Sequence, residues 1–200
     1  MTRFNSSGRL QAFVFILLLA LAPASAQQKQ EREFRIRKAQ FPESAREVME
    51  PYLEGVRRLR YYKEIDSARS SFEMKFKHRR LHYSIEFTPE GELEDAEVRI
   101  RSVDIPNETL EAIQAHLKGT YGRYRVRKIQ QQYPRASFES DSQTLKNAFQ
   151  NLLLPEIRYE LVIQTRQDSG LAHYELLYDS EGRLLRIRES LPPNYNHVLY

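Results

Sequence analysis

The sequence predicts an α+β protein made of two tandem repeats, each a helix packed on an antiparallel four-stranded sheet. Two internal matches indicate the duplication: residues 41–55 resemble residues 105–119, and residues 82–93 resemble residues 173–184. The third observation is a clean alternation of apolar and charged residues in the segments that follow each expected helix. Because the matched segments occur in the same order in both halves, we interpret them as copies of one unit.

The spacing of the matches predicts where the copies differ. The helical segments are offset by 64 residues and the later strand segments by 91, so the second copy is longer. We expect repeat 1 at residues 41–104 and repeat 2 at residues 105–190, with an insertion at about 133–155. The insertion should contain its own helix, because Leu145, Phe149 and Leu152 form an apolar stripe before Pro155.

Each repeat should begin with a helix. Pro42 and Pro106 stand near the start of the two matched segments, and Gly55 and Gly119 stand at their ends, which is the usual asymmetry of helix termini. Pro51 lies inside the first segment and should kink or shorten that helix.

The segments after each helix read as strands. Phe72, Met74 and Phe76 alternate with Glu73 and Lys75, so one face of the strand is apolar and the other charged. This pattern is typical of an antiparallel sheet covered on one side by helices. The tetrapeptides at 88–91 and 179–182 end in glycine, which suits the positive φ of a hairpin turn.

Residues 1–26 resemble a secretory signal peptide. Arg3 and Arg9 precede the uncharged apolar run 12–22, and the small residues at 24–26 suit cleavage after Ala26. The run is too short to span a bilayer, and no second apolar stretch follows, so we expect no transmembrane anchor. The sequence has no cysteine, so burial alone must stabilise the exported protein, which favours a periplasmic location over a eukaryotic extracellular one.

The segments that flank the repeats leave alternatives open. Residues 27–40 are polar and form either a disordered lead-in or a first edge strand. The tail at residues 191–200 is aromatic and apolar for a terminus. It either docks on the sheet as an edge strand or lid, or engages a partner by strand addition.

The repeated strand pattern, Tyr-x-Ile/Leu-x-Phe/Tyr followed by Gly-x-Leu, resembles the PepSY-like domains of bacterial periplasmic proteins, and the tandem arrangement is similar to the β-lactamase-inhibitor-protein fold. The matching positions are Tyr83, Ile85, Phe87, Gly91 and Leu93, and Tyr174, Leu176, Tyr178, Gly182 and Leu184. The resemblance implies binding or inhibition rather than catalysis, with proteases and other periplasmic enzymes as partners. It transfers no functional residue, because all ten positions are core or turn positions.

Basic and aromatic residues at equivalent places in the two copies form the candidate binding site. If the two sheets join, strand alternation would place them in one cationic stripe that could bind an acidic protein or an anionic envelope ligand. The alternative is an ordinary solvated face whose arginines pair with neighbouring glutamates. The predicted contact residues are Arg58, Arg60, Tyr62, Arg123, Arg125 and Arg127.

Other chemistries have little support in the sequence. The repeated pairs at 82–83 and 173–174 each contain a histidine, but zinc sites need three or four ligands, so we predict no metal. No serine-nucleophile motif or phosphate-binding loop is present, so we predict neither catalysis nor a cofactor. The formal charge of +4 falls to about +2 once Arg3 and Arg9 leave with the signal, and because we expect the protein to be exported, we predict no nucleic-acid partner.

These observations predict a non-catalytic periplasmic binding or inhibitor-like module. Such a protein would act as a monomer and capture an acidic protein or an anionic envelope ligand on a sheet face. The alternative is a structural or assembly factor of the cell envelope, which would dock through the tail at 191–200 or through the inserted helix.

Overall fold

One continuous sheet dominates the structure. The computed structural model describes residues 27–29, 31–66, 69–167 and 170–190, and the predicted signal peptide and tail lie outside these ranges. Within them, the ten strands lie in the order β1-β10-β9-β8-β7-β6-β5-β4-β3-β2. Strands β2 to β10 pair antiparallel, and β1 adds to β10 in parallel.

The strands are β1 (Gln27–Lys29), β2 (Glu31–Ile36), β3 (Val56–Asp66), β4 (Arg69–His78), β5 (Leu81–Phe87), β6 (Leu93–Arg99), β7 (Tyr124–Pro134), β8 (Arg158–Gln167), β9 (Gly170–Asp179) and β10 (Leu184–Ser190). The helices are α1 (Glu43–Met49), α2 (Asn107–Tyr121) and α3 (Asp141–Gln150). Short 3-10 turns are η1 (Lys38–Gln40), η2 (Glu50–Tyr52), η3 (Ser102–Asp104) and η4 (Arg135–Ser137).

The predicted fold class, α+β with two tandem repeats that are each a helix packed on an antiparallel four-stranded sheet, is wrong. The strands after α1 and those after α2 share one sheet because β6 pairs antiparallel with β7, from Asp95 opposite Pro134 to Arg99 opposite Gln130. The protein is mostly β, and its helices are short. The first helix ends at Met49, where η2, which contains Pro51, takes over. Matching of segments reveals the order of elements but not which strands are neighbours.

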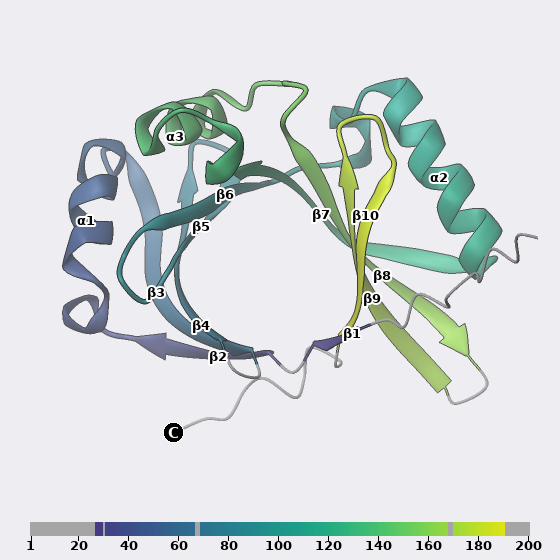
Figure 1. Ribbon diagram of the computed structural model, residues 1–200, viewed down its shortest axis with the longest axis horizontal. Helices are drawn as coiled ribbons and strands as arrows, with labels where there is room; N and C mark the ends of the chain where they lie inside the picture. Colours follow the sequence, from purple (N-terminus) through teal and green to yellow (C-terminus); the bar gives the residue numbers. More distant parts are fainter. Residues whose placement is uncertain (1–26, 30, 67–68, 168–169, 191–200) are drawn as a thin grey trace, which may run out of the picture.

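The sheet curves until its two edges approach each other, so the strands surround a central space (Figure 1). The segment at residues 27–40 supplies both edges: β1 pairs with β10, and β2 pairs with β3 at the opposite end of the sheet. Of the two alternatives for this segment, the structure therefore shows edge strands. Arg188 of β10 and Asp66 of β3 add an ion pair between the two ends, with 3.8 Å between Nη1 and Oδ2.

The helices lie on the outer side of the curved sheet (Figure 1), and the apolar core fills the layer between them. Alternate residues of the strands point outward into this layer, as the sequence pattern predicts. Met74, Ile85, Ala96 and Tyr133 lie directly opposite one another on four successive strands, and all four side chains are fully buried. The inward face is left to the charged residues of the same strands.

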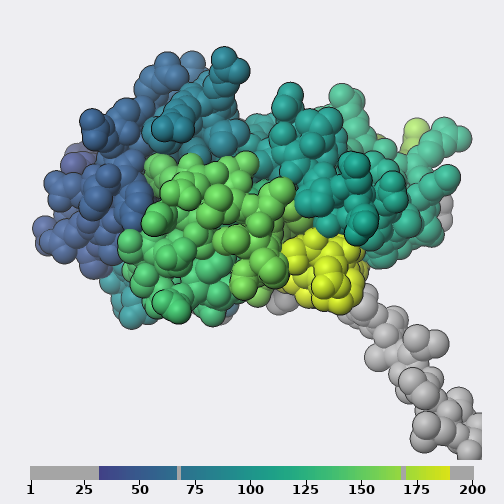
Figure 2. All heavy atoms as spheres, turned by 90° about the horizontal axis from the view of Figure 1, so that it is seen from above, coloured from purple at the N-terminus to yellow at the C-terminus, as the bar shows by residue number. Residues whose placement is uncertain are grey.

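Helix α3 packs on the outer face of β6 and β7, between α1 and α2 (Figures 1 and 2). Its anchor is Phe149, whose ring lies 4.9 Å from Tyr83, 5.3 Å from Tyr52 and 5.4 Å from His78, measured between ring centroids. The helix therefore covers the core and leaves the inner face of the sheet open. An envelope-docking role for α3 would have to use its exposed side, because the apolar side is already packed.

Two hairpin glycines lock the helices onto the sheet. Gly91 and Gly182 both have positive φ, of 84° and 82°. A Cβ at Gly182 would lie 2.8 Å from the carbonyl oxygen of Thr109 in α2, and the Thr109 hydroxyl donates a 2.7 Å hydrogen bond to the carbonyl of Ser180. At Gly91 a Cβ would meet Ser44 of α1 in the same way. Glycine is needed at both positions because the backbone has a positive φ and because a Cβ atom would clash with the neighbouring helix.

Gly182→Ala should lower the free energy of unfolding by about 2 kcal/mol, because alanine at positive φ is strained and its methyl group meets backbone atoms of α2. Gly119→Ala is the matched control: this glycine lies in the exposed last turns of α2 with nothing near its Cβ position. That variant should gain about 0.5 kcal/mol from helix propensity. Urea denaturation measures both, and equal effects of the two changes would contradict this account of the hairpin.

Candidate binding site on the concave face of the sheet

The inner face of the sheet lines an open cavity of about 1120 Å³. Strands β2 to β10 all contribute side chains to it, and nearly all of these are charged or polar. This composition follows from strand geometry, because every residue that neighbours an outward apolar residue points inward. The cavity is thus lined by the charged residues of the alternating pattern, and the curvature of the sheet brings them close together.

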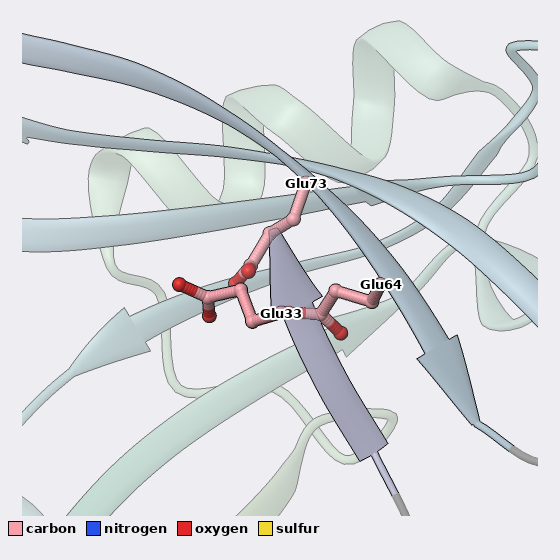
Figure 3. A group of neighbouring side chains, drawn as sticks. All are labelled: Glu33, Glu64 and Glu73. Carbon is pink, nitrogen blue, oxygen red and sulfur yellow. The ribbon is translucent and has the colours of Figure 1, made fainter. Parts of the chain in front are cut away.

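A lysine sits at the centre of three carboxylates at one end of the cavity. Glu33, Glu64 and Glu73 come from β2, β3 and β4, and their side chains point toward one another (Figure 3). The ammonium group of Lys75 lies 2.7 Å from Glu73 Oε2 and 3.9 Å from Glu64 Oε1, and it also pairs closely with Glu33. The ring of Tyr62 adds a cation–π contact, with its centroid 4.9 Å from Lys75 Nζ.

The carboxylates and the lysine of this group shift one another's pKa values. Burial raises the pKa of Glu73 well above its usual range, and the nearby Glu64 carboxylate raises it further. Desolvation lowers the pKa of Lys75, but Glu73 and Glu33 outweigh that effect and raise it on balance. The three carboxylates are the one group of metal-ligand type found among the described residues, yet the ammonium of Lys75 already bonds to them. We therefore assign them to a structural ion-pair cluster.

A second acidic group lies at the join between β6 and β7. Gln132 donates a 2.9 Å hydrogen bond from Nε2 to Asp95 Oδ2, and Gln130 donates to Glu97. The other oxygens of this arrangement, Asp95 Oδ1 and both glutamine Oε1 atoms, are buried and have no hydrogen-bond partner among the described residues. Acceptors thus outnumber donors here, which favours a protonated carboxyl.

The pKa values of Asp95 and Glu97 agree with this excess of hydrogen-bond acceptors. Burial raises the pKa of Asp95 well above its usual range, and the carboxylates of Glu86 and Glu97 add to the shift. Burial likewise raises the pKa of Glu97, with Glu160 as the next cause, while Lys128 lowers it. Lys128 pairs with Glu160 at 3.4 Å, so this lysine only partly offsets the negative charge of the group.

The third group is a basic row that crosses four strands. Lys77 lies opposite His82, and His82 lies opposite Arg99, so the three belong to β4, β5 and β6 in one register row. Arg58, at a bulge in β3, lines the cavity beside them. Arg58, Lys77 and Arg99 form no ion pair within the described ranges. Burial lowers the pKa of His82, and the charges of Lys77, Arg99 and Arg58 lower it further. We refer to these four residues as the basic row.

The structure separates the six predicted contact residues. The three from repeat 1, Arg58, Arg60 and Tyr62, all line the cavity. The three from repeat 2, Arg123, Arg125 and Arg127, do not. A bulge between Val126 and Lys128 is responsible for part of this, because it breaks the alternation. Arg127 then borders an apolar groove under α2, and Lys128 takes the inward position. Whether any of the six contacts a partner remains a prediction.

Sequence reasoning missed the residues that dominate the cavity. Asp95, Glu97 and Arg99 all line the cavity, and none of them is among the predicted contact residues. Their signal is the alternation with Ala96 and Val98, which places all three on one face of β6. Their neighbours on other strands depend on register, and no local pattern encodes that.

The two histidines of the repeated pairs do not meet. His82 lies on β5 and lines the cavity, whereas His173 is buried on β9, opposite Gln164. Three strands separate β5 from β9 in the sheet. A zinc site shared by this pair therefore has no geometric basis.

Comparison with known proteins gives limited likeness. No protein-family model matches the chain, and no curated protein matches it. A DUF2874 family protein from Bacteroides ovatus has 14% identity and a TM-score of 0.49, over 74% of this chain and 87% of that one. A candidate periplasmic protein from Bacteroides eggerthii has 15% identity and a TM-score of 0.49, over 74% and 88%. A BLIP-like protein from Bacteroides fragilis has 11% identity and a TM-score of 0.46, over 74% and 86%.

These structures resemble the chain in its general course only, and with TM-scores below 0.5 they support no functional argument. Within the described residues, no helix combines the length and the apolar character needed to cross a bilayer.

Lys75→Met should lower the free energy of unfolding at pH 7.5 by about 2 kcal/mol, because Glu64 and Glu73 lose their counter-charge in a mostly buried position. We expect a smaller loss of unfolding free energy than for a fully buried ion pair, because 37% of the Lys75 side chain is exposed. Lys77→Met is the matched control: this lysine has cationic neighbours, so its loss should change stability by less than about 0.5 kcal/mol. Urea denaturation of both variants measures the difference, and equal losses would refute the cluster.

Glu97→Gln should stabilise the protein at pH 8 and have little effect near pH 4.5. Burial raises the pKa of Glu97 in the folded state, so its contribution is fully present below the unfolded pKa and is lost as the pH rises through the folded pKa. The neutral amide avoids that loss and can still accept the hydrogen bond from Gln130.

Asp104→Asn provides a control of opposite sign. A hydrogen bond from the backbone N–H of Arg101 holds the pKa of Asp104 below its usual range, so its contribution is present at neutral pH and disappears in acid. This variant should therefore be less stable than the wild type at pH 7 and equal to it near pH 3. Thermal unfolding across this pH range tests both variants, and a pH-independent effect of Glu97→Gln would contradict the burial of its charge.

Proposed function

We propose that this protein is a non-catalytic periplasmic binding module that captures a partner protein inside the concave face of its sheet. The observation that carries the proposal is the open cavity of about 1120 Å³, which is lined by charged side chains on nine neighbouring strands. Cavities that bind small molecules are mostly apolar with a few polar groups, whereas this one is mostly polar. Its size and charge suit a protruding segment of another protein.

The arrangement of charge supports recognition rather than chemistry. The ammonium group of Lys75 is surrounded by carboxylates, whereas the basic row has no acidic partner within the described ranges. Charges held on paired strands are preorganised, so they favour a partner of complementary pattern and disfavour others. We assign the periplasm from the signal peptide predicted at residues 1–26, which lies outside the described residues.

Two charge reversals test the proposal with a matched pair. The exported protein, immobilised, is exposed to periplasmic extract, and the retained protein is identified and purified. Arg60→Glu changes a cavity residue, and Arg125→Glu changes an arginine of the predicted stripe that lies outside the cavity. Arg60→Glu should weaken the measured affinity by about tenfold or more, and Arg125→Glu by less than about twofold.

If Arg125→Glu weakens binding more than Arg60→Glu does, the contact lies at the part of β7 that carries Arg125, outside the cavity. Equal losses would support the original six-residue stripe over the cavity. If no protein is retained above the level of a denatured control, the binding function itself fails.

A further inference from the structure

We infer that the basic row is the part of the cavity that binds an extended acidic segment of the partner. The inference rests on the proposed function and deepens it, because it names the chemistry of the captured group and its place. It is carried by register and by the pairing of the surrounding charges.

The basic row is an unfavourable arrangement when empty. Lys77 and Arg99 lie on either side of His82 in one register row, and Arg58 lines the cavity beside them, so three permanent cations are held a few strand spacings apart and repel one another. Two other cations of the inner face have carboxylate partners: Lys75 bonds to three glutamates and Lys128 to Glu160. Across the described ranges no carboxylate forms an ion pair with the arginines or the lysine of the row. A bound anion would relieve the repulsion.

The dimensions of the row favour an extended ligand over a single small anion. Adjacent strands lie about 4.8 Å apart, so a row across four strands spans about 14 Å. Side chains on one face of an extended peptide recur every 6.6–6.8 Å or so, which places three carboxylates across about 14 Å. One phosphate group would contact only two neighbouring members of the row. Glu97 and Asp95 precede Arg99 on the same face of β6, so carboxyl groups begin directly beside the row and mark its edge.

His82 gives the binding a signature. Its pKa is lowered by burial and by Lys77 of β4, Arg99 of β6 and Arg58 of β3. An acidic segment laid on the row would offset those charges and raise the pKa of His82. Binding should therefore take up a proton and be stronger at pH 6 than at pH 8.

The test uses acetylated hexaglutamate as the probe and isothermal titration calorimetry as the readout, on the exported protein at low salt. Hexaglutamate should bind, with affinity falling steeply as salt rises. The double variant Lys77→Gln/Arg99→Gln should weaken binding at least tenfold, and Arg125→Gln should leave it within twofold. Because the double change removes like-charge repulsion, it should not lower the urea midpoint, so lost binding will not reflect unfolding. NMR of the His82 ring should show its pKa rising on addition of the peptide.

Two further probes separate the outcomes. Hexalysine should not bind to the basic row, and binding of tripolyphosphate tighter than that of hexaglutamate would overturn the peptide assignment in favour of a phosphate ligand. If hexaglutamate fails to bind at millimolar concentration, or binds equally to the double variant, the inference is wrong. The proposed function would survive that result if Arg60→Glu still weakens capture of the partner by about tenfold or more, because that experiment tests the cavity and not the row.

Discussion

The pairing of β6 with β7 is the contact on which the rest of the structure depends. It joins the strands that follow α1 to those that follow α2, so that one sheet forms where two could have formed. A sheet this long twists and coils, and its concave side becomes an enclosure. Had the halves folded apart, the charged face of each would have been an ordinary solvated surface. Joined, they place carboxylates, lysines and arginines of nine strands around one space.

That enclosure explains why the inner charges behave differently from surface charges. Glu73 and Glu160 would be solvated on a flat sheet, but here both are more than 90% buried. Burial makes pairing important: Lys75 stabilises its cluster, the glutamines of β7 stabilise Asp95 and Glu97 only in part, and the basic row has no counter-charge within the described chain. Across a few strands, the inner face thus changes from charges that have partners to charges that have none within the described residues. A charge without a partner at an open cavity is where a ligand of opposite charge gains the most binding free energy.

Local features of this fold could be predicted from the sequence, and long-range features could not. Alternation in β4 correctly assigned Met74 and Phe76 to the core, and glycine identified the hairpins at Gly91 and Gly182. These depend on a few neighbouring residues. The β6–β7 pairing depends on residues some 35 positions apart, and no repeat or periodicity specifies it. The positions of the predicted contact residues on β7 depend on a local irregularity as well: one extra residue near Arg127 reverses the inward side of the strand, and alternation alone cannot reveal a bulge.

The way in which the N-terminal strands hold the two ends of the sheet sets an order of events for an exported chain. Residue 27 pairs with residue 188, so the first strand after the predicted cleavage site must wait for almost the last one to emerge. Until β10 emerges, β1 has no partner and one edge of β9 is uncovered, and exposed strand edges are sites of unwanted association. The pairing of β1 with β10, which closes the sheet, also joins residues that are far apart in the sequence, and such long-range contacts slow folding. Closure of the sheet therefore requires residues 27–29 and residues 184–190 to be present together, so a chain that has emerged only as far as β9 has no closed cavity.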